Sequence, residues 1–377
     1  MKKILYLTAI LALPISCIQD KNDLVHEEVV ADIRAFEIEN QESCSLSYMD
    51  KAITVTMPPE TDASRLKITR LEYTEGATLS PNWAVGDIID LSSPVQLVLT
   101  TYDSYNWTIS AIVLEKPEKP EEPEIPEGPD PEAELTRDGP QLYNMDFDQW
   151  SFYPGTDYIY VLYGDDADES QQAVWAFWGQ TLPAYGLPTY SREEAFLAVE
   201  GEGKSALRLE TMDVTGSLAA GLVFNGEAAD FFPLTFDYKL GTPFLERPAA
   251  LEGYACYRPK IIDHCQAPYD DVAGEMDKGH VIILLTDWDD LFTVVPPTTL
   301  VDFVGDPAII GYGKFVFDQE TEGYEHFQVN ISYRSDRVPK YAAILISSST
   351  YGDYFTGGAG SVLYVDELAF LYEAPPQ

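Results

Sequence analysis

A run of proline and acidic residues most constrains how this chain can fold. Residues 115–134 read EKPEKPEEPEIPEGPDPEAE, with a proline at about every third position. Proline has no backbone N–H and acidic side chains resist burial, so this segment favours extended polyproline II and cannot enter a hydrophobic core. We therefore predict a Pro/Glu-rich linker over residues 115–137, which separates a module at 30–114 from a larger one at 138–377.

The chain begins MKKILYLTAILALPISC, in which two lysines precede a short apolar run that ends at a cysteine. The run is too short to span a bilayer and has the pattern of a secretory signal. Its end resembles a bacterial lipobox, in which the cysteine is acylated and becomes the first residue of the mature chain. We expect a signal peptide at 1–16, a lipid on Cys17 and a tether over 17–29; the alternative is an ordinary signal peptide with an incidental cysteine.

The module at 30–114 alternates short strand candidates with clusters of turn residues. The strand candidates are AITVTM (52–57), LKITRLEY (66–73), VQLVLTT (95–101) and NWTISAIVL (106–114). Short strands without a helical period are typical of an immunoglobulin-like sandwich. The module also resembles the small β modules that follow the lipid anchor in many surface lipoproteins. We expect it to hold the second module away from the membrane.

The module at 138–377 also has the period of β-strands. Apolar and polar residues alternate in PLTFDYKL (233–240) and EHFQVNISY (325–333), and further strand candidates are HVIILLTD (280–287) and YAAILISSS (341–349). Period two places one face of a strand inward and leaves the other polar. The turns carry Gly, Pro and Asp, and no strand–helix–strand alternation appears. The sequence therefore predicts an all-β chain whose second module is a jelly-roll β-sandwich.

The charge of the chain excludes several classes of partner. It has 63 Asp plus Glu against 23 Lys plus Arg, a net charge of −40. Nucleic acids and anionic lipids require basic surfaces, so we expect neither, and we expect contact with a membrane through the lipid anchor alone. The sequence predicts an outer-membrane lipoprotein on the cell surface, with the periplasmic face as the alternative.

Five blocks of the second module carry a family resemblance. They are NMDFDQW (144–150), AFWGQ (176–180), AAGLVFNGE (219–227), LGTPFLERPAALEGYACYRP (240–259) and SSSTYGDYFTGGAGSVLYVDELAFLY (347–372). Together they resemble the putative carbohydrate metabolism domain, a β-jelly-roll of exported lipoproteins in glycan-degrading bacteria. The resemblance implies a jelly roll and a glycan as partner. It implies no catalytic residues, because the family has no defined reaction.

Aromatic side chains are the first candidates for contact with a sugar, because their faces stack on pyranose rings. In AVWAFWGQTLPAYGLPTY, Trp175 and Trp178 lie on opposite faces if the segment is a strand. We expect Trp178 and, from the following loop, Tyr185 to contact glycan. The alternative is that both tryptophans belong to the core.

Polar candidates come from two of the family blocks. Arg247, Tyr254 and Arg258 offer forked and hydroxyl donors that suit sugar hydroxyls or uronate carboxylates. In so acidic a chain the alternative for the arginines is an internal salt bridge. Asp353 lies in the glycine-rich loop before the last strand, where it either contacts ligand or forms a turn.

The last strand, GAGSVLYVDELAFLY (358–372), carries two adjacent acids at its centre. With so many acids in the chain, such pairs are expected by chance and do not indicate catalysis. In many sugar-binding jelly rolls a structural calcium bridges the first and last strands, and the corresponding residues here are Asp148 and Asp366. Calcium favours such oxygen ligands; the alternative is that the acids of the last strand face water at an edge. The phase of the apolar residues also predicts a β-bulge at Asp366-Glu367. Beyond this calcium we expect no cofactor.

The cysteines beyond the anchor allow one pairing. Cys256 and Cys265 are close enough in sequence to clip the loop between them as a disulfide, which an oxidising compartment permits. The other cysteine, Cys44, is expected to be a small buried residue. No second pair stands at the spacing of zinc ligands.

These observations favour a surface protein that binds glycan without cleaving it, in carbohydrate uptake or adhesion. A glycoside hydrolase or lyase would need convergent carboxyl groups, and no sequence motif for such a pair is present. A fimbria-like structural subunit and a structural partner of an outer-membrane complex are the remaining alternatives. Other outer-membrane glycan-uptake proteins are the expected protein partners.

Overall fold

The computed structural model describes residues 30–116, 118–123, 134–157, 159–177, 189–214, 216–228 and 237–374. The chain divides into two compact units between Lys116 and Pro117. Within the described ranges the helical elements are single turns, and nearly all regular structure is β. The all-β class predicted from the sequence is confirmed.

The first unit is an immunoglobulin-like sandwich of two sheets, as predicted. One sheet has the order β1-β4-β6 and the other β2-β3-β8-β7-β5, with β3 and β8 parallel. Alternate residues of β3 point inward, where Ile53 and Val55 pack with the fully buried Trp107. The strands are β1 Ile33–Ile38, β2 Ser43–Ser47, β3 Ala52–Met57, β4 Leu66–Tyr73, β5 Thr78–Ser80, β6 Ile88–Ile89, β7 Val95–Thr100 and β8 Ser104–Val113.

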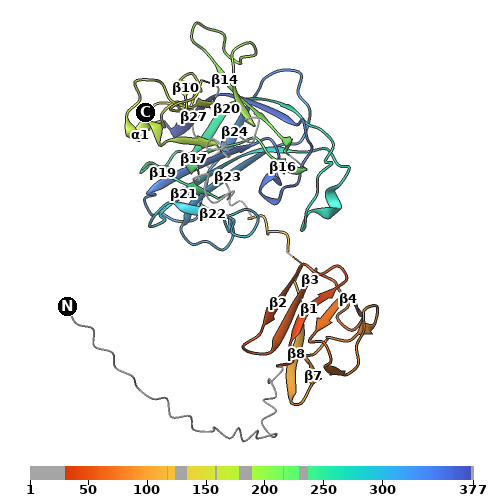
Figure 1. The fold of residues 1–377 in the computed structure, drawn as a ribbon. Helices are drawn as coiled ribbons and strands as arrows, with labels where there is room; N and C mark the ends of the chain where they lie inside the picture. Colours follow the sequence, from red (N-terminus) through yellow and green to blue (C-terminus); the bar gives the residue numbers. More distant parts are fainter. Residues whose placement is uncertain are drawn as a thin grey trace, which may run out of the picture. The chain divides into compact units, whose positions relative to one another are not determined.

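The second unit is a jelly-roll sandwich, and Figure 1 shows its two main sheets as separate layers. The nine-stranded sheet contains β22 Phe292–Val294, β18 Tyr238–Leu240, β17 Leu222–Ala228, β26 Tyr341–Ser347, β21 Gly279–Thr286, β23 Ile309–Phe317 and β25 Ser332–Tyr333 in that order, with β12 Trp175–Phe177 beside β17 and β19 Thr242–Pro243 beside β26. The six-stranded sheet contains β13 Tyr190–Glu193, β14 Ala206–Glu210, β27 Val362–Glu373, β20 Ala250–Arg258 and β24 Glu325–Asn330, with β9 Leu135–Thr136 beside β27.

Short elements complete the second unit. Two hairpins pair β10 Ser151–Phe152 with β11 Tyr160–Val161 and β15 Met212–Val214 with β16 Ser217–Ala219. The helical turns are α1 Glu169–Gln172, η1 Asp270–Val272 and η2 Gly352–Tyr354. The last two lie in loops that form walls of a cavity.

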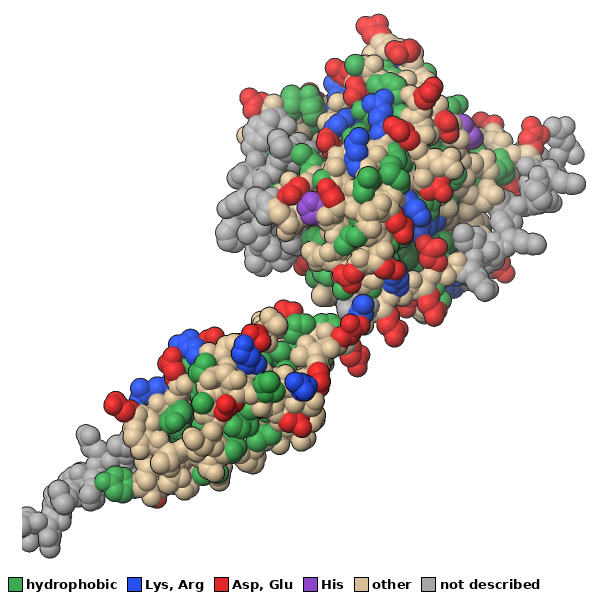
Figure 2. Space-filling view, turned by 90° about the vertical axis from the view of Figure 1, so that its right-hand side faces the viewer, with side chains coloured by type: hydrophobic (Ala, Val, Ile, Leu, Met, Phe, Trp, Pro, Cys, Tyr) green, Lys and Arg blue, Asp and Glu red, His purple; other side chains and the backbone are tan. Residues whose placement is uncertain are grey.

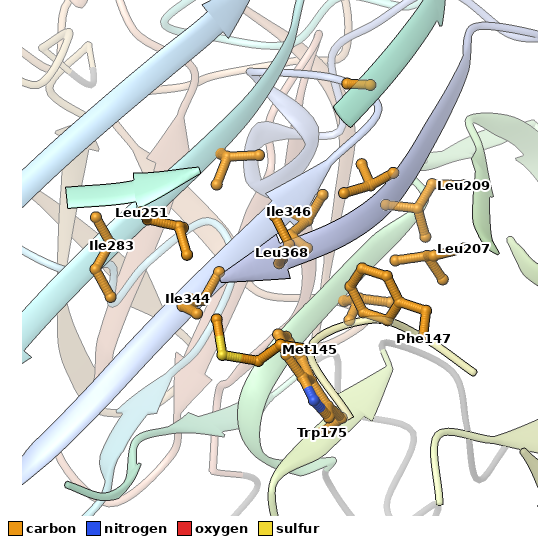
Figure 3. Close-up of a cluster of buried hydrophobic side chains, with 14 of the residues drawn as sticks. Met145, Phe147, Trp175, Leu207, Leu209, Leu251, Ile283, Ile344, Ile346 and Leu368 are labelled. Carbon is orange, nitrogen blue, oxygen red and sulfur yellow. The ribbon is translucent and has the colours of Figure 1, made fainter. Parts of the chain in front are cut away.

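The main core fills the space between the two sheets. Figure 3 shows side chains from both sheets, and from the segment before the first hairpin, converging there: Met145, Phe147, Trp175, Leu207, Leu209, Leu251, Ile283, Ile344, Ile346 and Leu368. Trp175 is 2% exposed and its Nε1 donates to the Tyr143 carbonyl, 2.8 Å away. Of the two tryptophans in AVWAFWGQTLPAYGLPTY, Trp175 therefore packs in the core.

The nine-stranded sheet is covered on its outer face as well. Ile282, Leu284 and Leu345 point away from the main core and pack under Trp288, Val294, Val301 and Phe303, which come from the segment 287–308 between β21 and β23. Every residue of β21 is buried. This two-sided burial explains why HVIILLT is an unbroken apolar run rather than an alternating one.

The β-bulge predicted in the last strand is present. Tyr254 of β20 pairs with Asp366, but Glu252 pairs with Ala369, so β27 carries one extra residue. The backbone irregularity lies at Glu367, whose φ of 52° is in the left-handed region. The bulge restores one inward face, because the apolar residues on both sides of it lie in the main core: Leu363, Val365, Leu368 and Phe370.

The predicted disulfide is wrong, since Cys256 and Cys265 are free cysteines. Cys256 is fully buried on the outer face of β20, enclosed by Val362 and Tyr364, and its thiol lies 3.7 Å from the Thr321 carbonyl oxygen. Cys265 follows His264, which bridges to Gly357 in a different loop. Spacing along the chain could not reveal that the strand holds Cys256 on a packed face.

Candidate functional site

A cavity of about 120 Å³ opens on the outer face of the nine-stranded sheet. Its floor is formed by side chains of the strands, among them Tyr238, His280, Tyr312 and Lys314. Three tyrosines from the loops form its wall: Tyr269, Tyr351 and Tyr354. A second depression shares His280, Thr350 and Asp353 with this cavity, so the two hollows meet at the same polar groups.

Strand register explains why polar groups gather on this floor. His280 and Ile282 are alternate residues of β21, and Ile282 pairs with Lys314 of β23, so all three point to the outer face. Tyr312 is two residues before Lys314 and points the same way. The floor is thus a small set of polar side chains on an otherwise apolar sheet face.

The tyrosine wall is built from two loops. The Tyr269 ring stacks on Tyr351, with ring centres 4.0 Å apart and an interplanar angle of 26°. Tyr354 meets Tyr269 edge to face, at 5.0 Å between ring centres. All three side chains are half-buried, and each presents part of its ring to the cavity. Partly exposed tyrosine faces of this kind suit stacking on sugar rings, with the hydroxyls available for hydrogen bonds.

Among the described residues that line the cavity, Asp353 is the carboxylate that comes from the sheet and its loops. The Tyr238 hydroxyl donates to it over 2.9 Å. Burial raises the pKa of Asp353 to about 6, and burial also raises the pKa of Tyr238, with the Asp353 charge adding to it. The sequence singled out Asp353, and the structure brings it into the cavity.

His280 adds a neutral polar group to the floor. It is 8% exposed, and burial lowers its pKa to about 3, with the nearby Lys314 charge adding to the effect. At neutral pH the imidazole is therefore uncharged, and its Nδ1 lies 3.4 Å from the Thr350 hydroxyl. Sequence reasoning missed His280 and Lys314. The available signal was a polar residue at an outward position of a strand that is otherwise apolar.

The loop that carries Asp353 is fixed at both ends by a buried carboxylate. Asp277 is fully buried and accepts hydrogen bonds from the Ser349 hydroxyl, the Ser361 hydroxyl (3.0 Å) and the Gly358 amide (2.9 Å). Burial raises the pKa of Asp277, while these donors oppose the increase. Both ends of the β26–β27 connection are thereby tied to one group.

The other predicted contact residues do not join Asp353. Tyr254 and Arg258 lie on the outer face of β20, in the six-stranded sheet, where the Arg258 guanidinium stands 5.2 Å from the Phe196 ring centre. Arg247 lies 4.0 Å over the Tyr333 ring and donates to the Ser335 carbonyl over 2.9 Å. Arg247 is therefore held by the protein itself.

The remaining aromatic predictions fall outside the described residues. Trp178 and Tyr185 lie between 177 and 189, where the structure describes nothing. Their contact with glycan stays a prediction. The tyrosines of the cavity wall, Tyr269, Tyr351 and Tyr354, are a different set, which the sequence did not indicate.

A lysine stands between Asp148, in the turn segment before β10, and Glu367 of the last strand, β27. Lys204 Nζ lies 2.7 Å from Asp148 and 2.8 Å from Glu367. Asp366 instead accepts from the Ala198 amide over 2.9 Å, and burial raises its pKa to about 6. The described residues contain no group of three or more His, Cys, Asp or Glu arranged to hold a metal. Lys204 supplies positive charge where calcium was expected, and the calcium site at Asp148 and Asp366 stays a prediction.

Charge on the surface follows the composition. On the face drawn in Figure 2, acidic side chains lie over both units and basic ones are fewer.

Within the described ranges, no helix is long and apolar enough to cross a membrane.

Comparison with known proteins gives two family matches. The model described as "Putative carbohydrate metabolism domain" matches residues 146–371, and the one described as "SGBP, N-terminal" matches residues 33–111. No curated protein matches the chain.

Several solved structures are similar at low identity. A protein of Bacteroides thetaiotaomicron described as a putative glycoside hydrolase is 22% identical, with 92% of this chain and 97% of that chain covered at a TM-score of 0.46. One of Bacteroides vulgatus with the same description is 19% identical, with 60% and 96% covered and a TM-score of 0.46. A family 16 carbohydrate-binding module is 12% identical, with 51% and 89% covered and a TM-score of 0.25. At these values the likeness does not bear on what this chain binds.

Replacing Lys204 by methionine should destabilise the second unit. The change leaves Asp148 and Glu367, which are 12% and 16% exposed, without the ammonium between them, so we expect the free energy of unfolding to fall by about 2 kcal/mol. Lys239→Met, which breaks an exposed pair with Glu227, should change it by less than about 0.5 kcal/mol. Denaturant unfolding measures both. Equal effects would contradict this account, and a melting temperature that millimolar Ca²⁺ raises and chelation lowers would favour the calcium prediction.

The raised pKa of Asp353 should make stability depend on pH. Because its folded pKa of about 6 lies above the unfolded value, its contribution is full below the unfolded pKa and is lost as pH rises through 6. The free energy of unfolding of the wild type, relative to Asp353→Asn, should fall by about 2 kcal/mol between about pH 4 and pH 7. Tyr238→Phe removes the donor that opposes the shift, so the decline should extend to higher pH. Parallel curves for the wild type and Asp353→Asn would contradict the assignment.

Proposed function

Because the chain belongs to the putative carbohydrate metabolism domain family, whose model matches residues 146–371, we propose that its second unit binds glycan without cleaving it. The observation that carries the proposal is the cavity on the outer face of the nine-stranded sheet. It joins partly exposed tyrosine rings to a few fixed polar groups, which is the usual composition of a sugar site.

Each part of the cavity has a role in this proposal. The faces of Tyr351 and Tyr354 stack on pyranose rings at the wall. Asp353, held by Tyr238, accepts hydrogen bonds from sugar hydroxyls, and a carboxylate acceptor makes these stronger than bonds between neutral groups. His280 stays uncharged and offers a neutral partner at the floor.

The distribution of carboxylates favours binding over hydrolysis. Glycosidases commonly place two carboxyl groups about 5 to 10 Å apart across the scissile bond. Among the described lining residues, Asp353 is the carboxylate of the sheet and its loops, and the others, Glu121 and Glu122, come from the linker and are exposed. Glu122 is moreover ion-paired with Lys314. This arrangement lacks a second fixed, desolvated acid.

The cellular setting belongs to the proposal as well. The lipobox-like sequence that ends at Cys17 supports a lipid anchor, and with it an outer-membrane lipoprotein that presents the second unit at the cell surface. Glycan capture for uptake or adhesion, beside other outer-membrane proteins of glycan uptake, fits that position.

Glycan binding should depend on the tyrosine wall. On a glycan array followed by calorimetry, we expect Tyr351→Ala to weaken binding about tenfold, since it removes one stacking face. Tyr254→Ala, which removes a tyrosine from the opposite sheet, should retain the wild-type affinity. Equal losses of affinity in both variants would indicate that the glycan site lies elsewhere. Absence of binding to every glycan would refute the proposal, and release of shorter sugars over time would establish the hydrolase or lyase alternative.

Lipidation is tested separately. In cells grown with labelled palmitate, the wild type should carry label and sediment with outer membranes. Cys17→Ala should lose the label and leave the membrane fraction, because no second acyl anchor is then available. A labelled or membrane-bound Cys17→Ala protein would contradict the anchor.

A further inference from the structure

Part of the acidic linker lines the cavity. Residues 118–123 belong to the second unit, and Pro120, Glu121, Glu122 and Pro123 are part of the cavity lining. Two ion pairs hold this segment. Lys119 Nζ lies 2.8 Å from both carboxylate oxygens of Asp271 and 5.3 Å above the Tyr269 ring centre. Glu122 lies 2.6 Å from Lys314 Nζ.

The Lys314 ammonium needs a negative partner. Its side chain is only 15% exposed, and it stands on the floor of the cavity between the sheet and the linker. Among the described residues, Glu122 is the carboxylate that forms an ion pair with Lys314. A cation that a ligand covers as the linker does is costly when unpaired, so a ligand that takes the place of Glu122 is favoured if it carries negative charge.

The linker is held weakly by comparison. The Glu122 side chain is 78% exposed, and the Lys119 and Asp271 side chains are 45% and 69% exposed. Exposed ion pairs contribute little to stability because water and salt screen them. Residues 118–123 also form no strand with the sheet, so no ladder of backbone hydrogen bonds holds them. The linker can therefore leave the cavity wall at small cost when another anion takes the place of Glu122 on Lys314.

We infer that residues 119–123 are a displaceable part of the wall of the glycan cavity, in which the Glu122 carboxylate holds the place of a sugar carboxylate on Lys314. The site accordingly selects glycans that contain uronic acid residues. A uronate restores the ion pair with Lys314 when the linker leaves, while its ring stacks on the tyrosine wall. This inference rests on the proposed function and assigns its substrate class and its regulation.

The net charge of −40 does not prevent such a ligand from binding. At physiological salt, charges farther apart than about 8 Å are largely screened, whereas a partly buried cation acts at contact distance. Local pairing with Lys314 thus outweighs the repulsion of distant acids. A neutral glycan would gain the stacking but would leave Lys314 unpaired once the linker is displaced.

The test uses the full chain, with trigalacturonate and triglucuronate as acidic probes and the matching neutral trisaccharides as controls. Glu122→Gln removes the competing carboxylate, so the acidic probes should bind about five times more tightly. Glu118→Gln makes the same charge change in the same segment, outside the cavity lining, and should leave the affinity as in the wild type. Lys314→Gln should lose binding of the acidic probes by at least about tenfold, and Lys314→Arg should retain most of it.

The outcomes separate this inference from the proposed function. If only neutral sugars bind, or if Lys314→Gln and Lys314→Arg bind the acidic probes equally, the glycan site stands and the uronate inference is wrong. If Glu122→Gln and Glu118→Gln change affinity alike, the linker is no competitor. If neither acidic nor neutral sugars bind to the wild type or to Glu122→Gln, both this inference and the proposed function fall.

Discussion

Burial of the nine-stranded sheet on both faces is the constraint on which the second unit depends. One face packs on the six-stranded sheet, and the segment 287–308 covers part of the other with Trp288, Val294 and Val301. An apolar sheet face left in water would cost about 25 cal/mol per Å², so this cover is needed for stability. The cover is incomplete, and the cavity lies where it ends. The candidate site is thus a gap in a layer whose main purpose is to protect the sheet.

A single buried carboxylate then makes that gap a defined site. Asp277 joins Ser349, Gly358 and Ser361, residues on both sides of the turn that carries Tyr351 and Asp353. A carboxyl group so far from water is tolerated only when its hydrogen bonds are satisfied, and here the donors are fixed by the loop itself. The glycine-rich loop is consequently ordered by its hydrogen bonds, although its composition alone suggests freedom.

Local patterns revealed the strands, and three-dimensional contacts decided the site. Period two and the phase change at Glu367 predicted the sandwich and its bulge, because both follow from neighbouring residues. Asp353 could be singled out as a loop acid, but its partner Tyr238 is 115 positions away and was not predictable as such. For the same reason Lys204 between Asp148 and Glu367, and the enclosed Cys256, required the folded chain. Contacts between residues that are far apart in the chain cannot be recognised from the spacing of residues in the sequence.

The linker shows why composition can mislead about function. The proline and glutamate content of residues 115–134 predicts a spacer that cannot build a core. Yet an extended, stiff chain loses little conformational entropy when it lies along a surface, so a few contacts are enough to hold it. Lys119 and Glu122 supply those contacts with opposite charges. A segment too polar to fold can therefore line a polar cavity. Because it has few apolar contacts to lose, a ligand can displace it.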